Sequence, residues 1–522
     1  MSQPATENID ITARYRGGRL NSFFNLSPGD ADAALSLHRP CDRSGLSASL
    51  DAYARRLSAP RAAREAIARL AHPKSRAVVA GQQTGLLLGP TYTLVKAVAA
   101  VKLARQLDTD ERPVIPIFWL ASQDGDTAEV DHAFLLDLRE QLTRVWLPLP
   151  RGVPVGRIVL DRRWVSSVAE QLAVLDVPDH YRAECLELLD EGAQGAVTPS
   201  DWFGSLLYKL LGPSGLVVVN PIERDVATLA LPTLKREIAD PLTSARLIND
   251  AAARLADLGE AAQLGRGQGS TNLFVEEDDG RRRPLKFHAG SFSTERTVYH
   301  TEELLALCED DASRVTPAAG LRPVVQDALL PTAITVVGPG ELGYFAQLKG
   351  VYDAHQVEMP LIWPRPTVTV LEPPVKRIIR KFGLELDELV RDFEAVRCRT
   401  LNELHGHGVK FEEARGALEH AMAQMLEQIR PVDPTLQRTV SRAGERIARN
   451  VELIEAKAGR ALAERDDIYS RQFQRLERHL FPAGAPQERS LSPFSFFLKF
   501  GIEPVLDRFL SLSPEGRHVV EL

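Results

Sequence analysis

Hydrophobic and polar residues recur with different periods along the chain, and these periods predict the elements of a parallel sheet. Residues 76–81 are a short apolar run, residues 91–108 carry apolar side chains at helical spacing, and residues 112–122 are a second apolar run. A strand, a helix and a strand in this order predict a βαβ unit. Residues 205–221 and 333–355 repeat the alternation of helix and strand. The sequence therefore predicts an α/β fold with a parallel-sheet core.

Further patterns predict segments added to this core. Residues 141–150 and 155–161 have the composition of strands. Residues 270–292 contain Asp-Asp-Gly between two strand-like runs, which predicts a small antiparallel insertion. We therefore expect the core to contain insertions at about 135–200 and 265–312.

The C-terminal part of the chain changes to long, charged helices. Apolar residues recur at steps of three or four in residues 411–429 and again in 440–461, which predicts a helical hairpin with a coiled-coil seam. The hairpin either packs on its own domain or pairs two subunits, and the pattern allows both. We expect a core domain over 1–375, a helical coiled-coil arm over 376–480, and a C-terminal segment over 481–522 that packs back on the core.

Composition and charge narrow the classes of protein. The chain has 522 residues, enough for a large core and more than one domain. Its formal net charge of −7 argues against a nucleic-acid-binding role. It has neither a run of 18 apolar residues nor an apolar signal-peptide segment, so no membrane span is expected. Its four cysteines lie far apart, which indicates no disulfide framework and no zinc site, and we expect a cytoplasmic protein.

The first candidate site is the loop GQQTGLLLGP after the first predicted strand. A glycine-rich loop before a helix can offer backbone N–H groups to a phosphate or carboxylate, and glutamine amides suit sugar hydroxyls. Lys96 is expected to lie too far into the helix to reach this loop. Alternatively, the glycines only permit a tight turn and the glutamines cap the helix. The candidate substrate-binding residues are Gly81, Gln82, Gln83, Gly85 and, at the start of the helix, Tyr92.

The second candidate site is SQDGDTAEVDH, which follows the second predicted strand. Carboxylates and a histidine at the end of a strand can deprotonate an attacking amine, bind a substrate amine or hold a metal ion. Asp124, Asp126 and His132 are the catalytic candidates, and Glu129 is a substrate-binding candidate. A histidine has a pKa near neutrality, which suits a base. The alternative is an acidic helix start that complements the helix dipole, and no metal ion is assigned.

The third candidate site is GPGELGYFAQLK, between a predicted strand and a predicted helix. Its glycines could face an anion or a nucleotide, Glu341 could bind an amine or ribose hydroxyls, and Tyr344 could stack on a ligand or donate to it. The alternative is a plain turn in which Glu341 complements the helix dipole. Arg322 and Arg365 could clamp a carboxylate or phosphate, or form structural salt bridges. The substrate-binding candidates of this segment are Gly338, Gly340, Glu341 and Tyr344.

These segments together resemble a known family. VVAGQQTGLLLGPTYTLVKAVAAVKLA, PIFWLASQDGDTAEVDH and the block from LRPVVQDALLP to LIWPRP are similar to signatures of the BshC family, the cysteine-adding enzymes of bacillithiol biosynthesis. The similarity covers residues 78–132 and 313–372, and LFPAGAPQER at 480–489 adds a further match.

The resemblance implies both an architecture and an activity. The architecture is a Rossmann-like core with inserted connecting segments, related in layout to class I aminoacyl-tRNA synthetases, and a C-terminal coiled coil that pairs two subunits as a homodimer. The activity is formation of an amide between cysteine and the amine of glucosaminyl-malate, the last step towards bacillithiol. Activation of the carboxylate by ATP or another nucleotide is expected, with small molecules as the substrates.

The sequence departs from the family in its second signature. Relatives usually have Glu-Asp-His-Asp where this chain has Gln123, Asp124, Gly125 and Asp126. Two alternatives follow from the missing charge and imidazole. The protein could be a catalytically impaired paralogue that acts as a coiled-coil scaffold, or an amide- or adenylate-forming ligase with another amine acceptor. Retention of the remaining candidate residues favours an active site.

Overall fold

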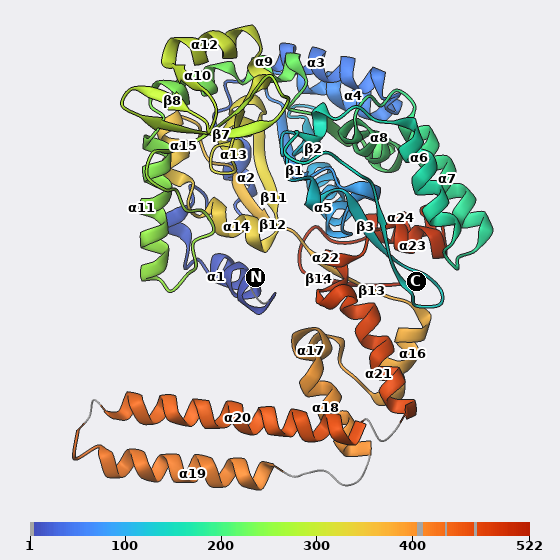
Figure 1. The fold of residues 1–522 in the computed structure, drawn as a ribbon, viewed down its shortest axis with the longest axis vertical. Coiled ribbons are helices and arrows are strands. Elements are labelled where there is room, and N and C mark those ends of the chain that lie inside the picture. Colours follow the sequence, from blue (N-terminus) through green and yellow to red (C-terminus); the bar gives the residue numbers. More distant parts are fainter. Residues whose placement is uncertain (1–4, 405–410, 434–435, 464–466) are drawn as a thin grey trace. The chain divides into compact units, whose positions relative to one another are not determined.

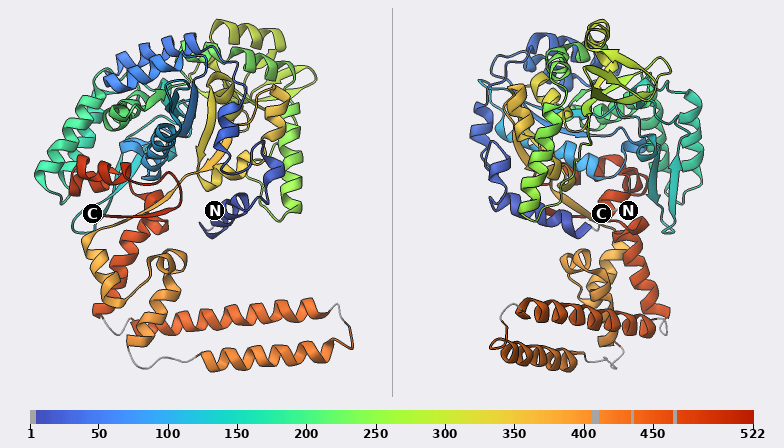
Figure 2. Two further views of the ribbon diagram at one scale, coloured as in Figure 1. Left: turned by 180° about the vertical axis from the view of Figure 1, so that it is seen from behind. Right: turned by 60° about the vertical axis from the view of Figure 1, so that its left-hand side comes forward.

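The computed structural model describes two compact units of the chain, shown in Figures 1 and 2. The described residues are 5–404, 411–433, 436–463 and 467–522. The first unit, called the body below, comprises Met1–Val370, Gln487–Val520 and Leu522, and the second, called the arm, comprises Leu371–Pro486 and Glu521. Among the described residues, no helix is both long and apolar enough to cross a membrane.

The body is built around a five-stranded sheet in which every neighbouring pair is parallel. Its strands in spatial order are β12 (Leu361–Pro364), β11 (Thr332–Val337), β1 (Arg76–Gln82), β2 (Val114–Leu120) and β5 (Val217–Val219). Every residue of β2, β5 and β11 is buried, because helices cover both faces of a parallel sheet. The predicted βαβ unit is confirmed, since α5 (Tyr92–Leu107) connects β1 to β2.

The order of the strands determines where this sheet can bind a ligand. From β1 the chain proceeds to β2 and then β5 on one side, whereas β11 and β12 lie on the other side of β1. The side on which successive strands are added to the sheet therefore changes between β1 and β11. Open parallel sheets bind ligands beyond the carboxyl ends of the strands at such a switch point.

Helices of the body pack against this sheet and against the inserted segments (Figure 1). α5 contacts β1, β2 and β11, and α4 (Arg61–Leu70) contacts β2 and β5. The other helices of the body are α1 (Ala5–Arg16), α2 (Ala31–Ser36), α3 (Arg43–Arg56), α6 (Arg162–Ala173), α7 (Asp179–Ala193), α8 (Pro199–Leu211), α9 (Arg224–Leu229), α10 (Leu231–Ala239), α11 (Thr243–Asp257), α12 (Thr301–Asp310), α13 (Arg322–Leu329), α14 (Pro339–Phe345), α15 (Lys349–His355), α22 (Gln487–Ser490), α23 (Phe494–Phe500) and α24 (Ile502–Leu510).

Three smaller sheets complete the body. The first is an antiparallel hairpin of β3 (His132–Leu136) and β4 (Leu142–Trp146). The second contains, in spatial order, β10 (Val315–Pro317), β6 (Ser270–Glu276), β7 (Arg282–His288), β8 (Ser291–Ser293) and β9 (Val298–His300). The third pairs β13 (Thr367–Leu371) with β14 (Arg517–Glu521). The predicted antiparallel insertion is confirmed, and Gly280 in its turn has the positive φ that favours glycine.

The strand predicted at 155–161 is wrong. Residues Val155–Arg157 form a short 3-10 helix instead. The backbone N–H of Val155 donates to the carbonyl of Asp124, and that of Gly156 donates to Ser122. These bonds connect the segment to the loop after β2 and not to a neighbouring strand. An apolar pattern does not reveal that the loop is the bonding partner.

The arm is helical, as the sequence predicts. Its helices are α16 (Pro373–Phe382), α17 (Leu386–Arg391), α18 (Phe393–Leu404), α19 (Glu412–Ile429), α20 (Gln437–Ala463) and α21 (Asp467–Leu480). A separate core around Val375, Leu389 and Phe473 holds α16, α17 and α21 together. α19 and α20 pack along each other as the predicted hairpin. Ile447 and Ile454 of α20 stay 41% and 54% exposed.

Residues 487–520 belong to the body although they follow the arm in the chain. Phe494, Phe496 and Phe497 of α23 are completely buried. The N–H and hydroxyl of Thr91 both donate to the carbonyl of Leu491, each at 2.7 Å. The last part of the chain therefore fixes the start of α5, next to the carboxyl end of β1.

Candidate functional site

A cavity of about 340 Å³ lies at the switch point of the sheet, between β1 and β11. Residues at the carboxyl ends of β1, β2 and β11 line it, together with side chains from α5, α13, α14 and α22. Its size is within the usual range for small-molecule sites, about 300–1,000 Å³. All of its lining residues belong to the body.

The structure brings most of the predicted site residues to this cavity but not all of them. Its lining includes Gly81, Gln82, Gln83, Tyr92, Asp124, Arg322, Gly338, Gly340, Glu341, Tyr344 and Arg365. The predicted residues outside the lining are Gly85, Asp126, Glu129 and His132. The three loops selected from the sequence therefore meet at one place, and only the middle loop contributes mainly through a single side chain, Asp124.

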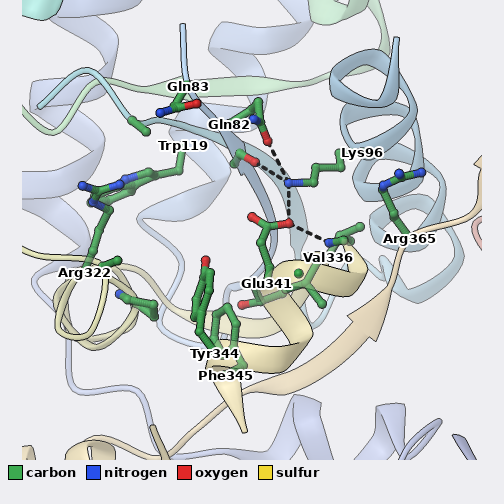
Figure 3. A pocket seen from close by; sticks show the side chains of 18 of the residues that line it. Gln82, Gln83, Lys96, Trp119, Arg322, Val336, Glu341, Tyr344, Phe345 and Arg365 are labelled. Atoms are coloured by element: carbon green, nitrogen blue, oxygen red, sulfur yellow. Dashed lines mark hydrogen bonds and ion pairs between the residues drawn. The ribbon is translucent and has the colours of Figure 1, made fainter. Parts of the chain in front are cut away.

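Lys96 lies at the centre of the cavity wall, so the expectation that it cannot reach the loop is wrong. Its ammonium group donates to the carbonyl of Gly81 at 3.0 Å and to Oε1 of Gln82 at 2.9 Å, and it pairs with Oε2 of Glu341 at 2.5 Å (Figure 3). Helical side chains point back towards the helix N-terminus, which lets a long side chain in the second turn of α5 reach β1. The side chain is only 2% exposed. Burial lowers the pKa of Lys96, and Glu341 opposes this shift.

The loop at 81–90 uses some of its backbone N–H groups within the protein, and its role as an anion cradle stays a prediction. The N–H of Leu86 donates to Val130 O at 2.9 Å, and that of Gly89 donates to Leu86 O at 2.8 Å. What the loop presents to the cavity is the side chains of Gln82 and Gln83. The amide of Gln82 donates to the hydroxyl of Tyr92 at 3.1 Å.

Gly85 has a structural position rather than one in the cavity. A Cβ atom there would lie 3.0 Å from the Cα of Gly89, so the two glycines allow the loop to close on itself. Gly85 lines a small apolar cavity with Trp202 and Phe203 instead. Glu129 acts on the site indirectly, because its carboxylate accepts a 2.6 Å hydrogen bond from the amide of Gln83.

The loop at 338–341 is also closed to an external anion at its first residue. The N–H of Gly338 donates to Oε2 of Glu341 at 2.6 Å, so the carboxylate of the same turn caps α14. Oε1 of Glu341 forms no hydrogen bond with any residue that the structure describes. Glu341 thus has one oxygen held by the protein and one oxygen available to a ligand.

Asp124 is paired with two arginines. Its carboxylate bonds both terminal nitrogens of Arg322, one of them at 2.9 Å, and lies 3.4 Å from Nη1 of Arg282. Burial alone would raise the pKa of Asp124, but the two guanidinium groups outweigh it, so the pKa lies below its ordinary value. A carboxylate with a lowered pKa is a weak base. This position suits charge balance and binding better than proton abstraction.

Arg365 is held by an ion pair of its own. Its guanidinium donates to both oxygens of Glu488, at 2.7 and 3.0 Å, and both side chains are almost fully buried. Tyr92 lies under the group, with its ring centre 5.2 Å from the guanidinium carbon of Arg365. Both predicted clamps, Arg322 and Arg365, are therefore engaged in salt bridges within the protein.

The lining residues that were not among the predicted site residues include Lys96, Trp119 and Arg489. Trp119 is next to last in β2, where the strand reaches the cavity, and a position at the end of a predicted strand was a usable signal. Arg489 is the last residue of LFPAGAPQER, the segment already singled out near the chain's end. Lys96 lies within the first segment that resembles the BshC family, and this membership was the available signal.

Several buried polar atoms of the lining residues have no hydrogen-bond partner within the described part of the chain. These atoms are Nε1 of Trp119, Nε of Arg322 and Oγ1 of Thr335. Unpaired buried polar groups are rare in folded proteins and concentrate where a ligand or water is bound. In the described residues, no three His, Cys, Asp or Glu side chains converge in a way that could hold a metal ion.

Comparison with known proteins identifies the family. Residues 11–366 match the N-terminal Rossmann-like domain of the bacillithiol biosynthesis protein BshC, and residues 368–518 match its C-terminal coiled-coil domain. The chain belongs to the BshC family. The match to the Rossmann-like domain lies within the body, whereas the match to the coiled-coil domain covers the arm and most of residues 487–520, which pack with the body.

Similar proteins named "Putative cysteine ligase BshC" are found in several bacteria. The one from Thermus thermophilus is 37% identical over 95% of this chain and 97% of its own length. Those from Salinibacter ruber and Geobacillus thermodenitrificans are 32% and 31% identical, each over 92% of this chain and 90% of their own length. A solved arginyl-tRNA synthetase-like structure from Campylobacter jejuni aligns over 85% of this chain and 94% of its own, with a TM-score of 0.21 and 10% identity, too low to bear on the fold.

The departures from the usual BshC signature lie beside the cavity rather than in it. Gln123 is buried, donates to Pro221 O at 3.4 Å and faces apolar residues behind Trp119. Gly125 lies against another loop, because a Cβ atom there would be 3.0 Å from the carbonyl carbon of Gly152. In this chain, the backbone of Gly152 thus occupies the space next to the position where relatives usually have a histidine.

The other members of the acidic segment are also outside the cavity. His132 begins β3, and its Nδ1 lies 2.7 Å from Oδ1 of Asp131. Asp126 is exposed and lines an adjoining hollow, which shares Gln83 and Asp124 with the cavity. Of the three predicted catalytic residues, the geometry brings only Asp124 to the cavity.

Proposed function

We propose that the protein is a cysteine ligase, which joins cysteine to the amine of glucosaminyl-malate and so forms bacillithiol. One observation carries the proposal: the cavity at the switch point is lined by the same three loops that contain the BshC signatures. The curated relatives named as cysteine ligases match almost the whole chain. Cysteine and glucosaminyl-malate are small and polar, which suits a cavity of about 340 Å³ with charged walls.

The cavity offers a place for the attacking amine. Oε1 of Glu341 is available to an ammonium group, while Lys96 and the N–H of Gly338 hold the other oxygen and fix the carboxylate plane. Gln82 and Gln83 supply amide groups that can exchange hydrogen bonds with sugar hydroxyls. We propose that Glu341 binds and orients the amine and that Asp124 balances the charge of Arg322.

Amide formation needs an activated carboxylate and a neutral amine. We propose that ATP or another nucleotide transfers a phosphoryl or nucleotidyl group to a carboxylate oxygen of cysteine, and that the nucleoside diphosphate or pyrophosphate leaves. The amine nitrogen then attacks the carboxyl carbon, a C–N bond forms, the C–O bond to the activating group breaks, and the nitrogen releases a proton. Glu341 is the best placed group to take that proton, since Asp124 is held ionised by two arginines.

The test is detection of the product by mass spectrometry. Purified protein is incubated with cysteine, glucosaminyl-malate and ATP, beside the Thermus thermophilus relative in parallel. Bacillithiol formation that is lost in Glu341→Gln and retained in Glu187→Gln, an exposed glutamate on α7, would support the proposal. No product from this protein while the relative is active would contradict it.

The same experiment separates the two alternatives. A ligase with a different amine acceptor would consume nucleotide with another amine but form no bacillithiol. A catalytically impaired scaffold would consume no nucleotide with any acceptor. The positions of Gln123 and Gly125 favour activity, because neither residue lines the cavity in which the reaction is proposed.

We also propose that the protein is a homodimer in the cytoplasm and that the hairpin of α19 and α20 forms the interface. Val440, Ile447 and Ile454 are spaced by seven residues along α20, so they lie on one line of the helix. Two of the three are more than one third exposed. An apolar line that its own chain leaves exposed suits a second copy of the hairpin.

A further inference from the structure

The cations that line the cavity are not all balanced by the protein. Lys96 pairs with Glu341, and Arg322 pairs with Asp124. Arg365 pairs with Glu488. The fourth cation, Arg489, forms neither an ion pair nor a hydrogen bond with any residue that the structure describes. Among these four cations, Arg489 is therefore the one without a carboxylate partner in the described chain.

The position of Arg489 is fixed although its side chain is exposed and unpaired. Its neighbour Glu488 binds Arg365 with both oxygens and also accepts from the N–H of Val368 at 2.8 Å. Gln487 bonds the N–H and the carbonyl of Val370, at 2.8 and 3.1 Å. These bonds anchor the short helix α22 on the edge of the cavity. The backbone that presents Arg489 is therefore held in place before any ligand arrives.

Arg489 belongs to a group of cations gathered around one aromatic ring. Its guanidinium carbon is 5.9 Å from the ring centre of Tyr92, that of Arg365 is 5.2 Å away, and Nζ of Lys96 is 5.8 Å away. An aromatic face stabilises a nearby cation by a modest amount, about 0.5–1 kcal/mol where it is exposed. The ring cannot replace a counter-ion for three cations, two of which have carboxylate partners. An anion from a ligand would complete the set.

We propose that Arg489 binds a carboxylate of the malate unit of the acceptor substrate, an inference that rests on the proposed ligase function. A guanidinium can bind a carboxylate through two parallel hydrogen bonds. The carboxylate of cysteine is converted into the amide during the reaction, so an arginine that anchored it would oppose its activation. The carboxylates of the malate unit are unchanged from substrate to product. They suit a permanent cation at the edge of the cavity.

The proposal is tested first by binding, without turnover. L-Malate alone is titrated calorimetrically into the full-length protein, into Arg489→Gln and Arg489→Lys, and into Arg105→Gln. Arg105 is an exposed arginine at the end of α5, outside the cavity. Loss of a charged hydrogen-bonded contact is expected to weaken binding about ten- to hundredfold in Arg489→Gln. Arg489→Lys should weaken it less, because charge remains but the two-pronged geometry is lost.

A kinetic test distinguishes binding of a malate carboxylate by Arg489 from binding of the cysteine carboxylate. The Michaelis constant for glucosaminyl-malate should rise in Arg489→Gln, while that for cysteine should stay at the wild-type value. A rise confined to cysteine would overturn the assignment, and so would L-malate binding that is equal in wild type and Arg489→Gln. If malate binding depends on Arg489 but no variant forms bacillithiol, the carboxylate site stands and the proposed function fails.

Discussion

Lys96 shows how one buried ammonium group can organise a site. It joins the carboxyl end of β1 to α14 by bonding Gly81 and Gln82 on one side and Glu341 on the other. Taking an ammonium group out of water is unfavourable, and only close acceptors compensate for it. The three acceptors thereby hold both the amide of Gln82 and the carboxylate of Glu341 in fixed orientations towards the cavity.

Replacement of Lys96 should therefore lower both activity and stability. In Lys96→Met, the carboxylate of Glu341 loses its ion pair, and we expect kcat to fall about ten- to hundredfold through lost orientation. Melting temperature should also fall, since an unpaired charge stays behind. Steady-state kinetics and thermal melting measure both effects. Lys102→Met on the same helix is the control, because Lys102 lies outside the cavity; equal loss in both variants would refute the assigned role.

Asp124 gives a prediction for pH. Its folded-state pKa is lowered, so its ion pairs stabilise the fold above the unfolded carboxyl pKa of about 3.9 and lose this effect as pH falls further. Asp124→Asn should lower the stability by about 3 kcal/mol at neutral pH. The gap to wild type should shrink below about pH 4.

Thermal melting between neutral and acidic pH measures this gap. The control is Asp126→Asn, two residues further on, whose carboxylate is exposed and has no ion pair in the described structure. A constant gap between wild type and Asp124→Asn across the whole pH range would mean that the ion pairs are not the source of the effect.

Gly125 provides the third test at this scale. Restoring the usual family residue in Gly125→His would place a Cβ atom 3.0 Å from the carbonyl carbon of Gly152, closer than packed atoms normally lie. Because backbone rather than a mobile side chain is in the way, we expect a lower melting temperature and no gain in turnover. Gly125→Ala should show a smaller decrease. Higher turnover with unchanged melting would show that the histidine can be accommodated and used.

At the scale of elements, the hairpin of α19 and α20 differs from the helices of the body. α8 buries nearly its whole surface, whereas α19 has no buried residue. A long helix in water gains most of its stability from packing an apolar face. Within one chain, Ile447 and Ile454 of α20 are not buried against other apolar side chains. Burial of these side chains against a second copy is the physical basis of the proposed dimer.

The proposed dimer predicts an effect of charge on that line. The double variant Ile447→Glu and Ile454→Glu should be a monomer by light scattering after size-exclusion chromatography, since burying each isoleucine is worth about 1.5–3 kcal/mol. Its body should melt as in wild type, because the arm has its own core. Arg442→Glu, an exposed change on the same helix, should leave the oligomeric state unchanged. A dimer that persists in the double variant would exclude this interface.

For the whole molecule, the sheet was predictable because its signals are local. Apolar runs and helical spacing lie within single segments, whereas the order of the strands is known only from the structure. The pairings that shape the cavity are not local. Asp124 and Arg322 are 198 residues apart, and Arg365 and Glu488 are 123 residues apart. The composition of either partner's segment does not reveal the other.

The same distinction explains the residues that the sequence misplaced. His132 and Asp126 share a segment with Asp124, but the chain turns after β2, and the turn brings only Asp124 to the cavity. Spacing along the chain indicated a cluster there, whereas a few backbone angles decide which side chain faces the ligand. The expectation for Lys96 was wrong because helical side chains tilt towards the helix N-terminus, which brings the ammonium group of Lys96 to Gly81 and Gln82.

The return of the chain to the body has a consequence for biosynthesis. Glu488 and Arg489 border the cavity, yet they are translated after residues 371–486 of the arm. Domains generally fold from the N-terminus onward while the ribosome is still adding residues. A nascent chain can thus complete its parallel sheet while Arg365 still lacks the carboxylate that neutralises it, and α5 lacks its bond to Leu491. The cavity is complete only when translation is nearly finished. A protein truncated within residues 371–486 would therefore have a body whose site lacks Glu488 and Arg489.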